Sequence, residues 1–177
     1  DVIKYFSELS DDIYYCMCDL DMIAVNDFSE AFNELVKKRI PLYYDITDQV
    51  IPAYGYETVH QDMKKLSPSI FESRWSGGEF ICGTSSFFKD LSTEIDHLYP
   101  NYLLNLKTLH HQGDEMITSV ALELLRLKNE YYIAEAGQLG IVGRYWSNWI
   151  LHPQKPFNWF EKCNFIHLPA DKPFLAN

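Results

Sequence analysis

The sequence predicts a single mixed α/β domain, and three observations lead to this fold class. The chain has 177 residues, 47% of them hydrophobic and 23% charged, which is the size and composition of one globular domain. No internal repeat, low-complexity run or Gly/Ser linker divides it, so residues 1–177 are assigned to one domain. Apolar runs typical of strands alternate with segments of helical spacing, the pattern of a layered α/β domain.

Short apolar runs bounded by turn residues predict the strands. The clearest run, residues 13–18, follows the turn at Asp11-Asp12 and is continuous, which is typical of a buried strand. Gly77-Gly78 is expected to form a turn between two short strands. The predicted strands are residues 13–18, 40–46, 70–75, 79–82, 131–134 and 165–168.

Apolar residues at helical spacing predict the helices. Residues 3–9 form the end of one helix, and Asn26 or Asp27 caps a second over residues 28–39. A third covers residues 87–98 and is capped by one of Thr84, Ser85 and Ser86. A fourth begins at Asp114, and its inner face consists of Ile117, Val120, Ala121, Leu124 and Leu125. Residues 49–69, which contain Pro52, Gly55 and Pro68, predict a long irregular loop with a short helix near Asp62.

The charge and the cysteines exclude several classes of protein. With 15 Lys and Arg against 25 Asp and Glu, the net charge of -10 argues against nucleic acid as a partner. A phosphate ligand would therefore need a divalent cation. No apolar run is long enough to span a bilayer, and the four cysteines include no CxxC pair. The absence of Asn-x-Ser/Thr sites favours a cytoplasmic location, with a membrane-associated or lumenal parent protein left open.

The strongest candidate for chemistry is Asp19-Leu20-Asp21, directly after the first predicted strand. Side chains two residues apart in extended chain point to the same side, so the two carboxylates would lie together while Leu20 points away. Two such like charges favour a cation between them, and oxygen ligands suit Mg²⁺ or Mn²⁺. The alternative is a solvated turn, because Asp-x-Asp is common by chance.

Three further segments are candidates, each with a plain structural alternative. In residues 77–83 the glycines would let a ligand approach the backbone and Phe80 would present a ring to a sugar, unless the segment is simply a hairpin. Asp114 and Glu115 follow Gly113 at a helix start and could act as nucleophile, base or charge stabiliser, or only as helix caps. His167 could complete a metal site and Lys172 could neutralise phosphate, although a single His in an apolar run is often a core residue.

Taken in this order, these pieces resemble the metal-dependent nucleotide-sugar glycosyltransferases of the GT-A fold. Asp19-Leu20-Asp21 looks like their DxD motif. Residues 77–83 and Asp114-Glu115 look like the glycine turn and the Asp-Glu pair of the retaining histo-blood-group galactosyltransferases. His167 and Lys172 look like the C-terminal metal-binding His and phosphate-binding Lys of the glycogenin-like and lipopolysaccharide transferases.

The resemblance implies a GT-A type, Rossmann-like mixed sheet flanked by helices that lacks part of the N-terminal nucleotide-binding half. It implies transfer of a sugar from a UDP-type donor to a hydroxyl of a carbohydrate or glycan acceptor, with retention of configuration. Asp19, Asp21 and His167 would bind Mn²⁺ or Mg²⁺, Glu115 would be nucleophile or stabiliser, and Asp114 would bind donor hydroxyls. The other donor-binding residues would be Leu20, Gly77, Gly78, Phe80 and Lys172, and the candidates for stacking on sugar or base are Phe80, Trp75, Tyr145 and Trp146.

Other functions remain open at this point. A nucleotidyltransferase would also use paired aspartates with a divalent ion, but would normally carry more Lys and Arg around its phosphates. A non-catalytic carbohydrate-binding module would explain the 15% of aromatic residues and leave the acids and His167 without a role. A metal-dependent hydrolase is a further possibility, although its usual His-rich ligand set is missing.

Overall fold

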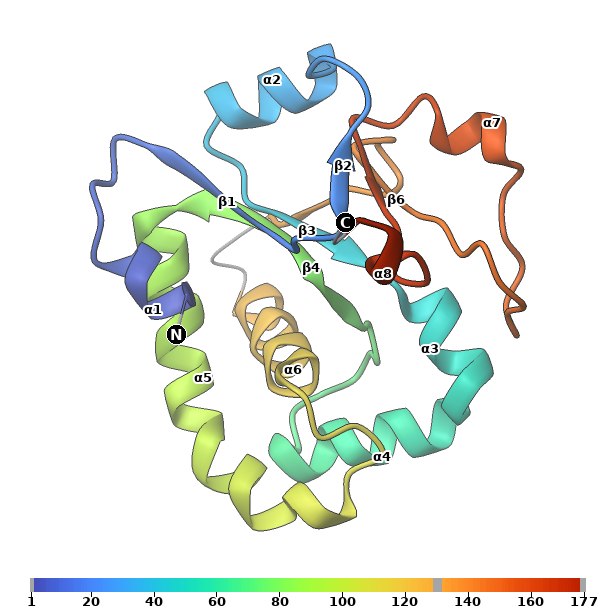
Figure 1. The fold of residues 1–177 in the computed structure, drawn as a ribbon. Helices are drawn as coiled ribbons and strands as arrows, with labels where there is room; N and C mark the ends of the chain where they lie inside the picture. The colour runs from blue at the N-terminus through green and yellow to red at the C-terminus, as the bar shows by residue number, and fades with distance from the viewer. Residues whose placement is uncertain (1, 129–131, 176–177) are drawn as a thin grey trace.

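The computed structural model describes residues 2–128 and 132–175, and these residues form two mixed β-sheets with helices around them (Figure 1). The mixed α/β class is therefore confirmed. The strands are β1 (Tyr14–Cys18), β2 (Met22–Ala24), β3 (Leu42–Asp45), β4 (Ser76–Thr84), β5 (Ala134–Glu135), β6 (Val142–Arg144) and β7 (Phe165–His167). The helices are α1 (Val2–Ser7), α2 (Glu30–Lys37), α3 (Thr47–Tyr54), α4 (Tyr56–Leu66), α5 (Ser85–Asn105), η1 (Leu106–Thr108), α6 (Asp114–Leu127), α7 (Phe157–Phe160) and α8 (Lys172–Leu175).

Strand β4 is the centre of the larger sheet, whose order is β1-β4-β3-β5. It pairs antiparallel with β1 and β3, and β5 lies parallel to β3. The predicted hairpin at Gly77-Gly78 is wrong, because both glycines lie within β4 and residues 70–75 form no strand. The glycines are there because the neighbouring side chains need space: a Cβ on Gly77 would lie 2.0 Å from Oε2 of Glu79.

The prediction that β1 is a strand is confirmed, but the prediction that this strand is buried is wrong. Tyr14 and Tyr15 are partly buried, whereas Cys16 and Cys18 are exposed. Among the described residues, β1 pairs with β4 alone and so forms the edge of its sheet. Because an edge strand has a neighbouring strand on one side only, its apolar side chains are covered only in part.

The predicted loop over residues 49–69 is wrong for most of its length, because α3 and α4 cover it, whereas the predicted short helix near Asp62 is confirmed as α4. Pro52 lies in the last turn of α3, and Gly55 takes a φ of +83° between the two helices, a value that glycine adopts without strain. Pro68 follows the Ser67 cap of α4, where a proline cannot interrupt the helix. The residues that suggested a loop are therefore helix ends.

The remaining helices follow their predicted spacing. The predicted cap is confirmed for α5 and is wrong for α2. Thr84 caps α5, since its hydroxyl accepts a hydrogen bond from the N–H of Phe87. Ser29 caps α2 in the same way, so the predicted caps Asn26 and Asp27 are wrong. The predicted strand over residues 131–134 starts outside the described residues; of its described part, residues 132 and 133 are not strand and Ala134 begins β5.

The core lies between the larger sheet and the helices α4, α5 and α6, which Figure 1 shows on one side of β4, with β2, β6, β7 and α7 on the other. Burying each large apolar side chain there contributes about 1.5–3 kcal/mol relative to leaving it exposed. Side chains with no exposed surface include Leu42, Val59, Met63, Phe80, Ile81, Phe87, Phe88, Leu91, Met116 and Val120. In the part of the chain that the structure describes, no helix has both the length and the apolar character of a bilayer span.

Candidate metal centre and adjoining cavities

Strand pairing brings three predicted ligands together from both ends of the chain. Asp19 and Asp21 lie between β1 and β2, and His167 ends β7. Met22 pairs with His167 in the antiparallel β2–β7 ladder, and the N–H of Leu168 donates to the carbonyl of Asp21 at 3.1 Å. One ligand atom from each of Asp19, Asp21 and His167 lies within 4.8 Å of the other two. The predicted meeting of two acids and a distant imidazole is therefore present.

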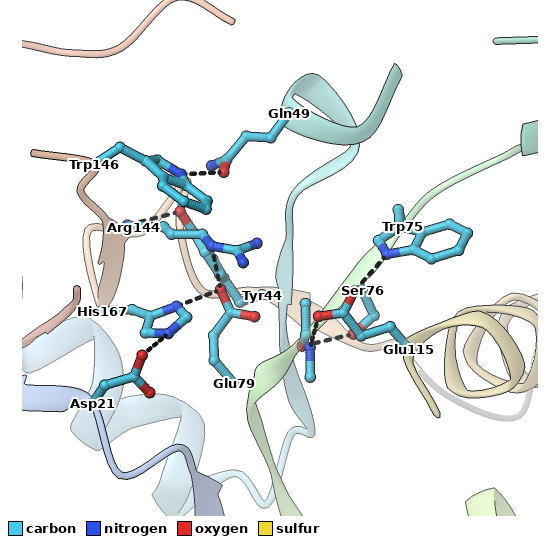
Figure 2. Close-up of polar contacts among 12 residues, drawn as sticks. Asp21, Tyr44, Gln49, Trp75, Ser76, Glu79, Glu115, Arg144, Trp146 and His167 are labelled. Atoms are coloured by element: carbon cyan, nitrogen blue, oxygen red, sulfur yellow. Dashed lines mark hydrogen bonds and ion pairs between the residues drawn. The ribbon is translucent and has the colours of Figure 1, made fainter. Parts of the chain in front are cut away.

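The imidazole of His167 lies between two carboxylates (Figure 2). Nε2 is 2.9 Å from Oδ2 of Asp21, and Nδ1 is 3.1 Å from Oε1 of Glu79. An ion bound here would displace any proton from Nε2 and use its lone pair, while the Nδ1–H of the imidazole donates to Glu79. A carboxylate that fixes the far nitrogen in this way is the usual support of a metal-binding histidine.

The two aspartates differ in environment. Partial desolvation raises the pKa of Asp19, and the Asp21 and Glu79 carboxylates add to this against the charge of His167. Burial also acts to raise the pKa of Asp21, but His167, a backbone N–H and Lys172 outweigh it, and the net pKa lies below the usual value. Asp21 is buried and ionised while Asp19 is exposed, so a divalent ion would neutralise this pair and remain open on the Asp19 side.

Glu79 and Arg144 are two functional candidates that the sequence analysis missed. Glu79 is 1% exposed, and Nε of Arg144 lies 3.5 Å from its Oε1. Burial raises the pKa of Glu79, but the hydrogen bond from His167 and the charge of Arg144 outweigh it, so the carboxylate is ionised. Its other oxygen, Oε2, has no hydrogen-bond partner among the residues that the structure describes. The available signal was an acid inside the apolar run 79–82, a costly position without a charged partner.

Lys172 and Leu20 border the three ligands differently. Lys172 begins α8, and its Nζ lies 3.3 Å from Oδ2 of Asp21, while its side chain is 60% exposed. An exposed lysine that already points to the aspartate could turn to a phosphate bound there. Leu20 is completely exposed between the two aspartates, so it contributes its backbone and not a packed side chain.

Glu115 lies on the other side of β4 from this group (Figure 2). Its Oε2 accepts a hydrogen bond from Nε1 of Trp75 at 3.2 Å, and its Oε1 one from the N–H of Gly78 at 3.4 Å. Nε2 of His111 is 3.7 Å from Oε2. The absent side chain of Gly78 makes room for this approach, since a Cβ there would lie 3.3 Å from Cγ of Glu115. Asp114, the preceding residue, is exposed at the start of α6.

Several predicted ligand-binding residues turn out to be structural. Phe80 is completely buried and packs against Phe165 at a centroid distance of 5.8 Å, so the prediction that its ring faces a sugar is wrong. Trp75 is 1% exposed and holds Glu115 through its indole N–H. Tyr145 packs edge-on against Phe157 and Phe160. These rings are used for packing because they lie on the strands and turns that close the core.

Two cavities share part of their lining. The larger, about 690 Å³, lies among residues of β3, α3, β5 and the segment 152–160, including Asp45, Asp48, Glu135, Lys155 and Trp159. The smaller, about 490 Å³, is lined by Glu115, Trp75, His111, Tyr54, Trp146 and Trp149 among others. Both are also lined by Gln49, Arg144 and His152.

Arg144 is the residue that links the three ligands to these cavities. It contacts Glu79, which holds His167, and it lines the cavity that contains Glu115. Consecutive residues of β4 thus serve two groups: Gly78 contacts Glu115, and Glu79 contacts His167 on the opposite face. Asp19, Asp21 and His167 line neither of these two cavities.

Comparisons of the chain with protein-family models, with curated proteins and with solved structures found no match.

Proposed function

We propose that this chain is a metal-dependent glycosyltransferase of GT-A type, which moves a sugar from a UDP-type nucleotide-sugar to a hydroxyl of a carbohydrate acceptor. The observation that carries the proposal is the convergence of Asp19, Asp21 and His167 within 4.8 Å, with Lys172 at 3.3 Å from Asp21. The resemblance noted in the sequence assigns those same four residues to the metal and the diphosphate.

The donor set fits a manganese or magnesium ion. Two carboxylates and one neutral imidazole supply oxygen ligands that both ions accept and a nitrogen that Mn²⁺ accepts more readily. Glu79 orients His167 from behind, and the exposed side chain of Asp19 leaves one side of the group accessible. When bound, the ion would act as a Lewis acid that stabilises negative charge on the leaving diphosphate.

The residues of the chain would act as follows. Lys172 would pair with a phosphate oxygen, and Asp21 and His167 would bind the ion together. As the bond between the anomeric carbon and the diphosphate oxygen breaks, its electron pair leaves with the diphosphate. Glu115, held by Trp75 and Gly78, would serve as nucleophile or as stabiliser of the cationic sugar, which accords with a retaining outcome.

Calorimetric titration of UDP in the presence and absence of Mn²⁺ tests this proposal. We expect UDP to bind with Mn²⁺ or Mg²⁺ and not in the absence of a divalent ion, and Asp21→Asn to lower the affinity by at least ~10-fold. Asp96→Asn, an exposed aspartate on α5, is the matched control and should bind as the natural sequence does. UDP binding that survives both EDTA and Asp21→Asn would overturn the proposal.

The same titrations separate the other functions. A nucleotidyltransferase would prefer UTP over UDP and release diphosphate from it. A carbohydrate-binding module would bind free sugar with neither UDP nor the ion.

A further inference from the structure

We propose that the 490 Å³ cavity containing Glu115 is the acceptor site, and that it takes an uncharged pyranoside whose ring lies on the indole of Trp149. This inference rests on the proposed function and adds to it the place and the chemical class of the acceptor. The cavity lies within the roughly 300–1,000 Å³ range of small-molecule sites.

The walls of the cavity combine aromatic faces with a few polar groups. The aromatic lining includes Tyr54 of α3 and Trp146 and Trp149 of the segment that follows β6. Trp149 is 83% exposed and Tyr54 45% exposed, although both line a cavity. Large apolar rings left open to solvent at a cavity mark a surface that gains by being covered. The C–H face of a pyranose ring covers such an indole, while its hydroxyls remain free for polar partners.

The polar groups of the cavity suit hydroxyls. Glu115 is 24% exposed at its side chain, so its carboxylate is held by Trp75 and still accessible. His111 is 31% exposed at its side chain beside it, and Gln49 is fixed by accepting a hydrogen bond from the indole N–H of Trp146 at 3.1 Å. Fixed donors and acceptors of this kind give specificity for hydroxyl groups.

The charges of the cavity argue against an anionic ligand. Its charged lining residues are Glu115 and Arg144, and Nε of Arg144 is paired with the buried Glu79. Burial lowers the pKa of His152, which is therefore neutral at pH 7. Arg144 is 14% exposed at its side chain, whereas Lys172, which also pairs with a carboxylate, is 60% exposed and can reach a phosphate next to Asp21. The donor phosphates and the acceptor sugar are thus assigned to different places.

This assignment gives a balanced transfer. The acceptor oxygen forms the new bond to the anomeric carbon, the bond from that carbon to the diphosphate breaks, and the hydroxyl proton leaves with the nucleoside diphosphate. Glu115 ends the reaction in its starting form.

Saturation-transfer NMR on the whole chain tests the inference, with UDP, Mg²⁺ and a panel of methyl gluco-, galacto- and mannopyranosides as probes. We expect saturation of the ring protons of at least one glycoside, and binding about tenfold weaker in Trp149→Ala. Trp149→Phe keeps an aromatic face and should retain most of the signal. Phe71→Ala is the matched control, because Phe71 is 77% exposed and lines neither cavity.

The outcomes separate this inference from the proposed function. Saturation transfer to UDP without any to a glycoside would overturn the acceptor site and leave the donor site standing. The same conclusion would follow from a glycoside signal that is unchanged in Trp149→Ala. Loss of the uridine signal in Trp149→Ala makes the cavity a nucleoside site and also overturns it. A glycoside signal that depends on Trp149 without any binding of UDP supports the sugar site and contradicts the glycosyltransferase.

Discussion

Glu79 and His167, 88 residues apart in the sequence, are joined by a hydrogen bond of 3.1 Å between Oε1 and Nδ1. Both side chains are buried, and Nε2 of the same imidazole faces Asp21. The pair therefore links β4 of the larger sheet to β7, the middle strand of the smaller sheet. It also leaves Nε2 as the nitrogen of His167 that faces the candidate metal centre, so Glu79 would orient this ligand.

Replacing Glu79 by Gln should weaken Mn²⁺ binding by roughly 10–100-fold, because the amide is a poorer acceptor for the Nδ1 proton and leaves Arg144 unpaired. Calorimetric titration with MnCl₂ measures the effect. The thermal unfolding midpoint of the variant is to be recorded alongside, so that loss of fold is recognised. Unchanged Mn²⁺ affinity in a folded variant would show that Glu79 does not support the ion.

Replacing Glu115 by Gln should reduce turnover of a UDP-sugar by at least ~100-fold, since the charge next to the reacting carbon is lost. The dissociation constant of UDP should stay the same, because Glu115 lies across β4 from the aspartates. Steady-state rates and UDP titration give the two numbers separately. Glu30→Gln changes an exposed glutamate in the first turn of α2 and is the matched control. A turnover equal to that of the control would remove Glu115 from the mechanism.

The two glycines of β4 should respond differently to substitution by Ala. In Gly77→Ala the new Cβ lies 2.0 Å from the Glu79 carboxylate, so Glu79 must move and stability should fall by about 1–3 kcal/mol. In Gly78→Ala the nearest atom is Cγ of Glu115 at 3.3 Å, which requires only a small shift. Urea unfolding measures both changes. Equal losses in the two variants would contradict the tight packing of Glu79 against Gly77.

Asp62 should make the stability dependent on pH in the acid range. Burial acts to raise the pKa of Asp62, but hydrogen bonds from Lys65 and from the backbone and ring of His110 outweigh it, and the net pKa is lowered. A carboxyl whose pKa is lower in the folded state stabilises the fold above its unfolded pKa of about 3.9. That contribution disappears as the pH falls from this value through the folded pKa.

Asp62→Asn should therefore lower the free energy of unfolding by roughly 1.5–3 kcal/mol at pH 7. The difference from the natural sequence should shrink as the pH falls below about 4. Urea unfolding over a pH series is the measurement, with Asp96→Asn as an exposed control. A difference that stays constant down to the acid limit would mean that Asp62 is not ionised in the fold.

Local pattern was sufficient for the long helices and for the strands with apolar runs. Helix α6 begins at Asp114 as expected because its apolar positions repeat at helical spacing. The pattern placed a helix near Asp62 but failed over the rest of residues 49–69, where Pro52 lies in the last turn of α3 and Gly55 follows its end. It failed again at Gly77-Gly78, because a glycine turn and a glycine that yields space to Glu79 look alike in the sequence.

By itself the sequence determined the α/β class and the side-chain types of the candidate metal ligands, since periodicity and residue type can be read from single segments of the chain. That Asp21 meets His167 from 146 residues away was a hypothesis until the register of β2 against β7 placed them together. Only the tertiary structure decided that Glu79 supports this histidine, that Phe80 is core, and that Glu115 faces a separate cavity. Strand register and the alternation of side chains across β4 decide such contacts, and neither is encoded within a single segment.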